Sequence, residues 1–217
     1  MHFRGWTATP RLPYVLSGNA LCMPVPGYTT LLGLIGCCLG RIVEHHEVRL
    51  GFQYKYDYTN MDIETRQRLI YKNKKVKKQN KGPDAYRREF HSNPELTLWL
   101  NRIDWLASFQ KPEGTPALGQ SQDLLSISKA HVVQAEQVLK GKIKGTLLPY
   151  IGNEQAHGQL ISMAEAYTEN DTIGSGRSPV SSKIFLAIPP DAEVEVEDDH
   201  LYQIGNSNTI YLHDFDE

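Results

Sequence analysis

The chain has 217 residues, of which 40% are hydrophobic, so it can form the core of one sizeable domain or of a domain with a large insertion. No apolar run approaches the roughly 20 residues that span a bilayer, and the first residues do not form a signal peptide, so we expect a soluble, cytoplasmic protein without a membrane partner. The net charge of −2 conceals a basic body, because nine of the 25 acids and none of the 23 Lys and Arg lie after residue 190. The first 190 residues therefore carry 16 acids and a net charge of +7, which favours a polyanionic partner.

The three cysteines, Cys22, Cys37 and Cys38, do not form a recognisable pattern. Their number is odd, two of them are adjacent, and no CxxC pair is present, so neither a disulfide framework nor a zinc site is expected. We predict no metal site and no cofactor.

The first elements in chain order are a short strand, a loop and a helix. Residues 3–9 can form the strand, and a loop rich in Pro and Gly follows it. The helix is predicted to begin near Thr29, which is a good N-cap, and to run to about Gly40. Apolar residues occupy almost the whole circumference of this helix, which predicts that the helix is buried. Its glycines allow the close approach of another backbone.

The middle and the end of the chain contain several strand signals. Apolar and polar residues alternate over residues 48–58, and a helical pattern covers residues 103–109. Shorter strand signals cover residues 64–71, 87–91, 96–100, 145–149, 183–188 and 209–212. Residues 131–139 fit helix or strand equally well, and residues 150–180 are weakly patterned. We predict an α+β domain with a ferredoxin-like or RRM-like first half and a Lys-rich arm inserted between two strands.

Basic residues are concentrated in residues 72–91, where eight Lys or Arg face only two acids. Each cation near a phosphate adds salt-dependent affinity, and the interleaved Tyr71, Tyr86 and Phe90 can stack on unpaired bases. The eight basic residues are Lys72, Lys74, Lys75, Lys77, Lys78, Lys81, Arg87 and Arg88. This composition favours contact with RNA or DNA, and a solvated surface hairpin is the alternative.

Two further segments are candidates for phosphate binding. Tyr28, Thr29 and Thr30 stand at the predicted helix start, where backbone amides are free, hydroxyls can assist, and no acid occupies the first turn. Residues 174–178 place Arg177 in a glycine loop whose backbone can approach a phosphate. A merely capped helix and a mobile linker are the respective alternatives.

No catalytic constellation is recognisable in the sequence. His45 and His46 are adjacent, so their side chains diverge, and the chain has no nucleophile elbow, P-loop or zinc ligand cluster. We predict that the chain is not an enzyme. General acid–base chemistry by a His, Lys or Tyr needs no motif and stays open as the alternative.

Three motifs together resemble one protein family. Residues 26–36 (PGYTTLLGLIG), with Leu39-Gly40 following, are similar to the N-terminal signature of the fifth-numbered Cas proteins, the Cas-five family of the RAMP superfamily. Residues 87–90 (RREF) and 93–100 (NPELTLWL) resemble the strand–turn–strand that follows the thumb of that family, and residues 118–123 (LGQSQD) resemble its glycine-containing loop. The resemblance covers roughly residues 1–150, and the subtype looks closest to type I-B.

The resemblance implies both a fold and a function. It implies an RRM/ferredoxin-like domain over residues 1–150, an inserted basic β-hairpin thumb at about residues 70–92, and a smaller C-terminal β region with an acidic tail over residues 151–217. The chain would be a non-catalytic subunit of a type I CRISPR surveillance complex (Cascade) that grips the 5′ handle of the guide RNA (crRNA) and caps the foot of the backbone filament. Arg4 and the helix start would hold handle phosphates, and the arm would follow the guide beside a filament subunit.

The resemblance also implies further partners and leaves rival functions open. The large subunit of the complex and, through the complex, target DNA would be additional partners. In the type I-C branch the related chain is itself a metal-independent endoribonuclease that cuts precursor crRNA. A general single-strand binder outside CRISPR would instead lack preference for the handle.

Overall fold

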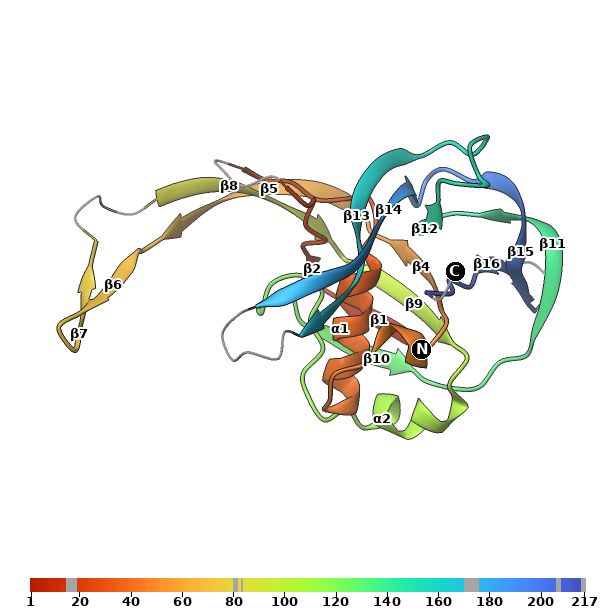
Figure 1. Ribbon diagram of the computed structural model, residues 1–217, viewed down its shortest axis with the longest axis horizontal. Coiled ribbons are helices and arrows are strands. Elements are labelled where there is room, and N and C mark those ends of the chain that lie inside the picture. Colours follow the sequence, from red (N-terminus) through yellow and green to blue (C-terminus); the bar gives the residue numbers. More distant parts are fainter. Residues whose placement is uncertain (15–18, 80–81, 83, 170–175, 206–207, 216–217) are drawn as a thin grey trace.

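A four-stranded antiparallel sheet, with the strand order β10-β1-β9-β4, forms the centre of the N-terminal part. The computed structural model describes residues 1–14, 19–79, 82, 84–169, 176–205 and 208–215. The strands of this sheet are β1 (His2–Gly5), β4 (Leu50–Lys55), β9 (Glu95–Leu100) and β10 (Leu125–Lys129). Helix α1 (Tyr28–Leu39) lies between β1 and β4 in the chain, and the short helices η2 (Ile103–Trp105) and α2 (Leu106–Gln110) connect β9 to β10 (Figure 1). The predicted α+β class is confirmed.

One face of this sheet carries the core. Phe3, Phe52, Leu96 and Leu98 are at most 1% exposed and belong to the same apolar cluster as the buried residues of α1. Neighbouring strand positions point to the other face, as the period of two requires. That second face is polar and carries the predicted RNA-binding residue Arg4.

Helix α1 begins two residues earlier than predicted. Gly27 in an extended conformation is the N-cap and has no side-chain cap hydrogen bond, so the prediction of Thr29 as N-cap is wrong. The helix ends at Gly40, whose φ of 70° is the left-handed conformation that suits glycine, and the short helix η1 (His45–Glu47) follows before β4. A Cβ on Gly36 would overlap with the Arg41 carbonyl, which confirms the expected close backbone approach there, whereas a Cβ on Gly33 would meet nothing within 4 Å.

The predicted arm is a long antiparallel hairpin that extends away from the body (Figure 1). Its stem pairs β5 (Tyr58–Arg66) with β8 (Asp84–Ser92), and its tip pairs β6 (Leu69–Lys72) with β7 (Lys75–Lys78). Asn73 and Lys74, with φ of 55° and 57°, form the two-residue turn. Two short strands, β2 (Thr7–Ala8) and β3 (Asn19–Ala20), pair with β8. The single strand predicted over residues 48–58 is therefore two strands, because β4 ends in the central sheet and β5 begins in the arm.

The C-terminal part contains two three-stranded sheets. The first sheet has the order β11-β15-β16 and consists of β11 (Ala135–Ile143), β15 (Val194–Ile204) and β16 (Asn208–Tyr211). The second sheet has the order β12-β14-β13 and consists of β12 (Thr146–Pro149), β13 (Gln159–Glu169) and β14 (Arg177–Ile188). Strand β13 lies where the sequence was weakly patterned. The loop predicted at residues 174–178 is also corrected, because Arg177 and Ser178 begin β14, while residues 174 and 175 lie outside the described residues.

The acidic end of the chain is paired with lysines in this structure. Lys140 on β11 contacts Glu195 and Glu197 on β15 at 2.5 and 2.9 Å, and Lys142 lies 3.6 Å from Glu193. Opposite charges on facing strands stabilise a ladder. The acidic side chains of β15 and of Glu193 therefore neutralise the lysines of β11.

Residues from both sides of position 150 share the main apolar core. Ile161, Met163, Phe185 and Phe215 join the cluster that contains α1 and the central sheet. The domain boundary at residue 150 stays a prediction.

The three cysteines are unpaired. Within the described residues, no helix is long and apolar enough to cross a membrane.

Candidate nucleic-acid interface

Cations without neighbouring acids cover the tip of the arm. Residues 67–79 contain six Lys or Arg and no acid. The five lysines of this segment are exposed, and none forms an ion pair with another residue of the described parts of the chain: Lys72, Lys74, Lys75, Lys77 and Lys78. Lys81, the sixth predicted lysine, lies outside the described residues. Lysines held at an arm tip without internal partners can exchange their counterions for phosphates at little structural cost.

The strand register separates the tip into two different faces. Because paired residues of an antiparallel ladder lie on the same face, Lys72, Lys75 and Lys77 share one face with Ile70. The opposite face carries Lys78 and three apolar side chains that are 62–74% exposed, namely Leu69, Tyr71 and Val76. The tip therefore presents a cationic face and a largely apolar face.

The stem residues predicted to bind RNA behave differently from one another. Arg87 is exposed and stays a candidate. Tyr86 donates its hydroxyl to the Glu64 carboxylate at 2.7 Å. Arg88 is corrected to a structural role: its side chain is 11% exposed, donates to Gln120 at 3.3 Å, and has its guanidinium carbon 5.6 Å from the centroid of the Phe90 ring. It ties the stem to the glycine-containing loop instead of facing a ligand.

That loop is held by close backbone contact. Gly119 has a φ of 116°, and a Cβ added to it would overlap with the Thr9 backbone. Asp123 is fully buried, accepts the Thr7 hydroxyl at 2.7 Å, and also accepts the Gln120 amide at 3.0 Å. The segment is thus a structural support for β2 and the arm.

The helix start and Arg177 meet in one groove, although about 150 residues separate them in the chain. Thr29 and Thr30 line this groove together with Arg177, and Arg41 and Tyr167 also line it. No pattern in the sequence pointed to Arg41 or Tyr167, because their place in the groove depends on how β13 packs against α1. Glu113 also lines the groove and opposes the two arginines.

Tyr28 does not face the groove, and its predicted RNA contact is corrected. Its side chain is 1% exposed, and its hydroxyl donates to the Leu147 carbonyl at 2.8 Å. The Thr30 amide also donates to the Gly27 carbonyl at 3.0 Å, so it is already engaged within the first turn. At the helix start, the side chains available to a ligand are the hydroxyls of Thr29 and Thr30.

Arg4 lies on the polar face of the central sheet. Its side chain is 60% exposed and lies 3.3 Å from Glu95. Lys55 shares that carboxylate at 2.8 Å, and this contact, with burial opposing it, holds the pKa of Glu95 below its ordinary value. Two cations around one acid leave positive charge on this face.

A cluster of titratable side chains lies in the core. Burial raises the pKa of Glu165, but hydrogen bonds from His213 at 2.7 Å, from Ser181 at 2.6 Å and from Lys183 at 3.0 Å outweigh it and keep this pKa below its ordinary value. Burial lowers the pKa of His213, which is 1% exposed and stacks on Tyr28 at 4.1 Å. Tyr, His and Lys are thus adjacent, but the Tyr and His rings are enclosed and packed. No group of three or more His, Cys, Asp or Glu that could hold a metal ion occurs in the described residues.

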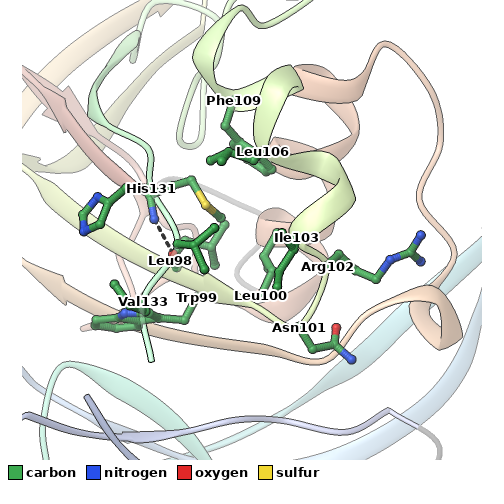
Figure 2. Close-up of a pocket in the computed structure, with 12 residues that line it drawn as sticks. Leu98, Trp99, Leu100, Asn101, Arg102, Ile103, Leu106, Phe109, His131 and Val133 are labelled. Atoms are coloured by element: carbon green, nitrogen blue, oxygen red, sulfur yellow. Dashed lines mark hydrogen bonds between the residues drawn. The ribbon is translucent and has the colours of Figure 1, made fainter. Parts of the chain in front are cut away.

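The hollow drawn in Figure 2 is small and mainly apolar. It lies between the end of β9, α2 and residues 131–133, and apolar side chains such as Leu100, Ile103 and Val133 form most of its wall. Met1 also lines it, and its amino group donates to the Leu98 carbonyl at 2.8 Å. Its volume of 230 Å³ is below the roughly 300–1,000 Å³ of typical small-molecule sites.

The fold is shared with proteins of RNA-guided CRISPR complexes. A chain of a solved structure described as a CRISPR RNA-guided surveillance complex superposes with a TM-score of 0.57 and 12% sequence identity, over 90% of both chains. A chain of the structure described as type III-B Cmr-beta bound to cognate target RNA gives a TM-score of 0.51 and 9% identity, over 89% of this chain and 86% of that chain.

These identities are low, so the likeness is one of fold. No family model and no curated protein matches the sequence. A third solved chain, described as a Cas protein, superposes with a TM-score of only 0.39.

Proposed function

We propose that this chain is the non-catalytic crRNA-binding subunit of a type I CRISPR surveillance complex, of a kind similar to type I-B. In this proposal it grips the 5′ handle of the guide and caps the foot of the backbone filament. Its partners are the crRNA, the filament subunits and the large subunit, and target DNA through the assembled complex. The observation that carries the proposal is the projecting hairpin, whose tip lysines form no ion pair with the described residues, on a fold shared with chains of CRISPR complexes.

Three features of the structure support the proposal. The chain order β1-α1-β4-β9-α2-β10 with the spatial order β10-β1-β9-β4 is the arrangement expected of an RRM/ferredoxin-like domain. The hairpin leaves this domain between β4 and β9, where a thumb would be inserted. The groove that joins Thr29, Thr30 and Arg177 offers hydroxyls and a cation to one ligand, and we assign the handle to it.

The absence of turnover belongs to the same proposal. Acid–base groups must come within hydrogen-bonding distance of the proton that they transfer. Tyr28 and His213 are each 1% exposed and contact one another, so they serve packing.

Binding and cleavage of repeat RNA test this function directly. The purified chain should bind RNA that contains the repeat-derived handle more tightly than a scrambled RNA of equal length, and should leave both uncut with or without Mg²⁺. Equal affinity for the two RNAs would identify a general single-strand binder. Cleavage at one repeat position, abolished by a single His or Tyr substitution, would identify the ribonuclease of the type I-C branch.

A further inference from the structure

Trp6 is the most exposed aromatic side chain of the described residues, at 85%. It stands in the bend between β1 and β2, and its carbonyl accepts the Asn93 amide at 3.0 Å, so its backbone is held at the root of the arm. Indole rings are normally buried or half-buried because they expose a large apolar area. An almost fully exposed indole on a held backbone therefore indicates a surface that something covers.

The surroundings of Trp6 combine polar and apolar groups. Trp6 lines a hollow together with Arg4, whose side chain is 60% exposed, and with Asn93, Thr115 and Ser126. Leu124, 51% exposed, and Leu125 form the apolar part of the wall. A flat aromatic face beside an arginine and several hydrogen-bonding groups fits an unpaired nucleotide, whose base stacks while its phosphate and edges find polar partners.

The place of Trp6 in the fold agrees with this ligand. Strand β2, which follows Trp6 directly, pairs with the last residues of β8, so the indole lies where the stem of the arm joins the body. Arg87 lies further out on β8, and the tip lysines continue beyond it. A strand of RNA that follows the arm inward would reach Trp6 before the polar face of the central sheet.

We propose that Trp6 is a base-stacking residue that, with Arg4, holds one unpaired nucleotide of single-stranded RNA at the root of the arm. This inference rests on the proposed RNA-binding function and adds to it a subsite separate from the groove at α1. Stacking on a π-face tolerates any base, so this subsite contributes affinity without sequence preference.

Tryptophan fluorescence gives a direct readout. The chain has three tryptophans, of which Trp105 is 6% exposed and Trp99 is half-buried, so an RNA-induced change at an exposed indole reports on Trp6. Oligouridylate and oligoadenylate of about 15 nucleotides serve as probes. Both should quench the emission of the wild-type chain, and Trp6→Phe should remove the quenching while it retains most of the affinity.

Affinity measurements complete the test. Trp6→Leu, which keeps an apolar side chain but removes the aromatic face, should weaken RNA binding roughly 5- to 150-fold, the range of one lost base stack. Ile151→Ala is the matched control, because Ile151 is also 85% exposed but lies in the C-terminal part. Both substitutions are at exposed positions, and unchanged melting temperatures would show that the fold is kept.

The outcomes separate the inference from the proposed function. If the wild-type chain binds RNA through the arm lysines but Trp6→Leu binds as tightly and no quenching occurs, the inference is wrong and the proposed function survives. If Trp6→Leu keeps its RNA affinity and loses co-purification with other subunits, Trp6 is a protein-docking residue and the inference is again wrong. If the wild-type chain binds neither handle RNA nor these probes, the proposed function and the inference both fail.

Discussion

The cationic face of the arm tip permits a quantitative prediction. Replacing Lys72, Lys75 and Lys77 by Ala removes three exposed cations that share one face and form no ion pair with the described residues. Each phosphate contact on a single strand contributes about 0.7 to the slope of log affinity against log salt, so the triple variant should lose about 2 in slope. Between 50 and 200 mM salt, wild-type affinity should therefore fall about 20-fold more than that of the variant.

The assay is fluorescence anisotropy with handle RNA over a salt series. The matched control replaces Lys111, Lys129 and Lys144, which are exposed and lie outside the arm, so both triple variants lose the same net charge. The control should keep the wild-type slope. Equal flattening in both variants, or no flattening in either, would refute the reasoning, because the arm would then contribute only general charge or none.

Three further substitutions test the helix start and the pH dependence of the fold. Thr30→Glu places an acid in the first turn of α1, so the melting temperature should stay equal or rise, with up to about 0.3–1 kcal/mol of added stability, while handle binding fails. Normal handle binding by this variant would remove Thr30 from the interface. Gly33→Ala adds a methyl group that meets nothing within 4 Å, so it should stabilise the fold by about 0.5–1 kcal/mol in thermal unfolding and weaken handle binding only if RNA lies against α1. His91 is 1% exposed, and burial lowers its pKa to about 4, below the unfolded value of 6.5, so its contribution to stability is complete above pH 6.5 and is lost as the pH falls toward 4. That loss amounts to about 3 kcal/mol. His91→Gln should flatten denaturant unfolding against pH over this window, and an unchanged pH dependence would contradict the assignment.

Local patterns in the sequence predicted the arm and the helix, because both depend on residues that are close together in the chain. The arm was found from its charge run and its strand alternation, and the five lysines described at its tip are exposed. The helix was found from its apolar residues, and its C-terminal end at Gly40 follows from the left-handed conformation that glycine adopts easily.

Contacts between distant segments account for the errors. Tyr28 was assigned to RNA binding because it stands at the predicted helix start, but it donates to the Leu147 carbonyl and stacks on His213. The pairing of the acidic segment with Lys140 was not predicted, because Lys140 lies more than 50 residues earlier, on a strand whose type the sequence left open. Strand alternation and turn residues predict which consecutive strands form a hairpin, but they do not show which distant strands are neighbours.

The enclosed cluster connects the C-terminal part to the helix start that lines the groove. The Tyr28 ring stacks on His213, which shares a 2.7 Å hydrogen bond with the Glu165 carboxylate on β13. Since the pKa of Glu165 is held low and that of His213 is lowered by burial, the stable form is a carboxylate that accepts the Nε2 proton of a neutral imidazole. Through this contact β13 fixes the first turn of α1, and the next residue along that turn, Thr29, lines the groove with Arg177. Tyr28, His213 and the Glu165 carboxylate thus orient the helix start, and the packing that encloses the Tyr28 and His213 rings also supports one wall of the groove.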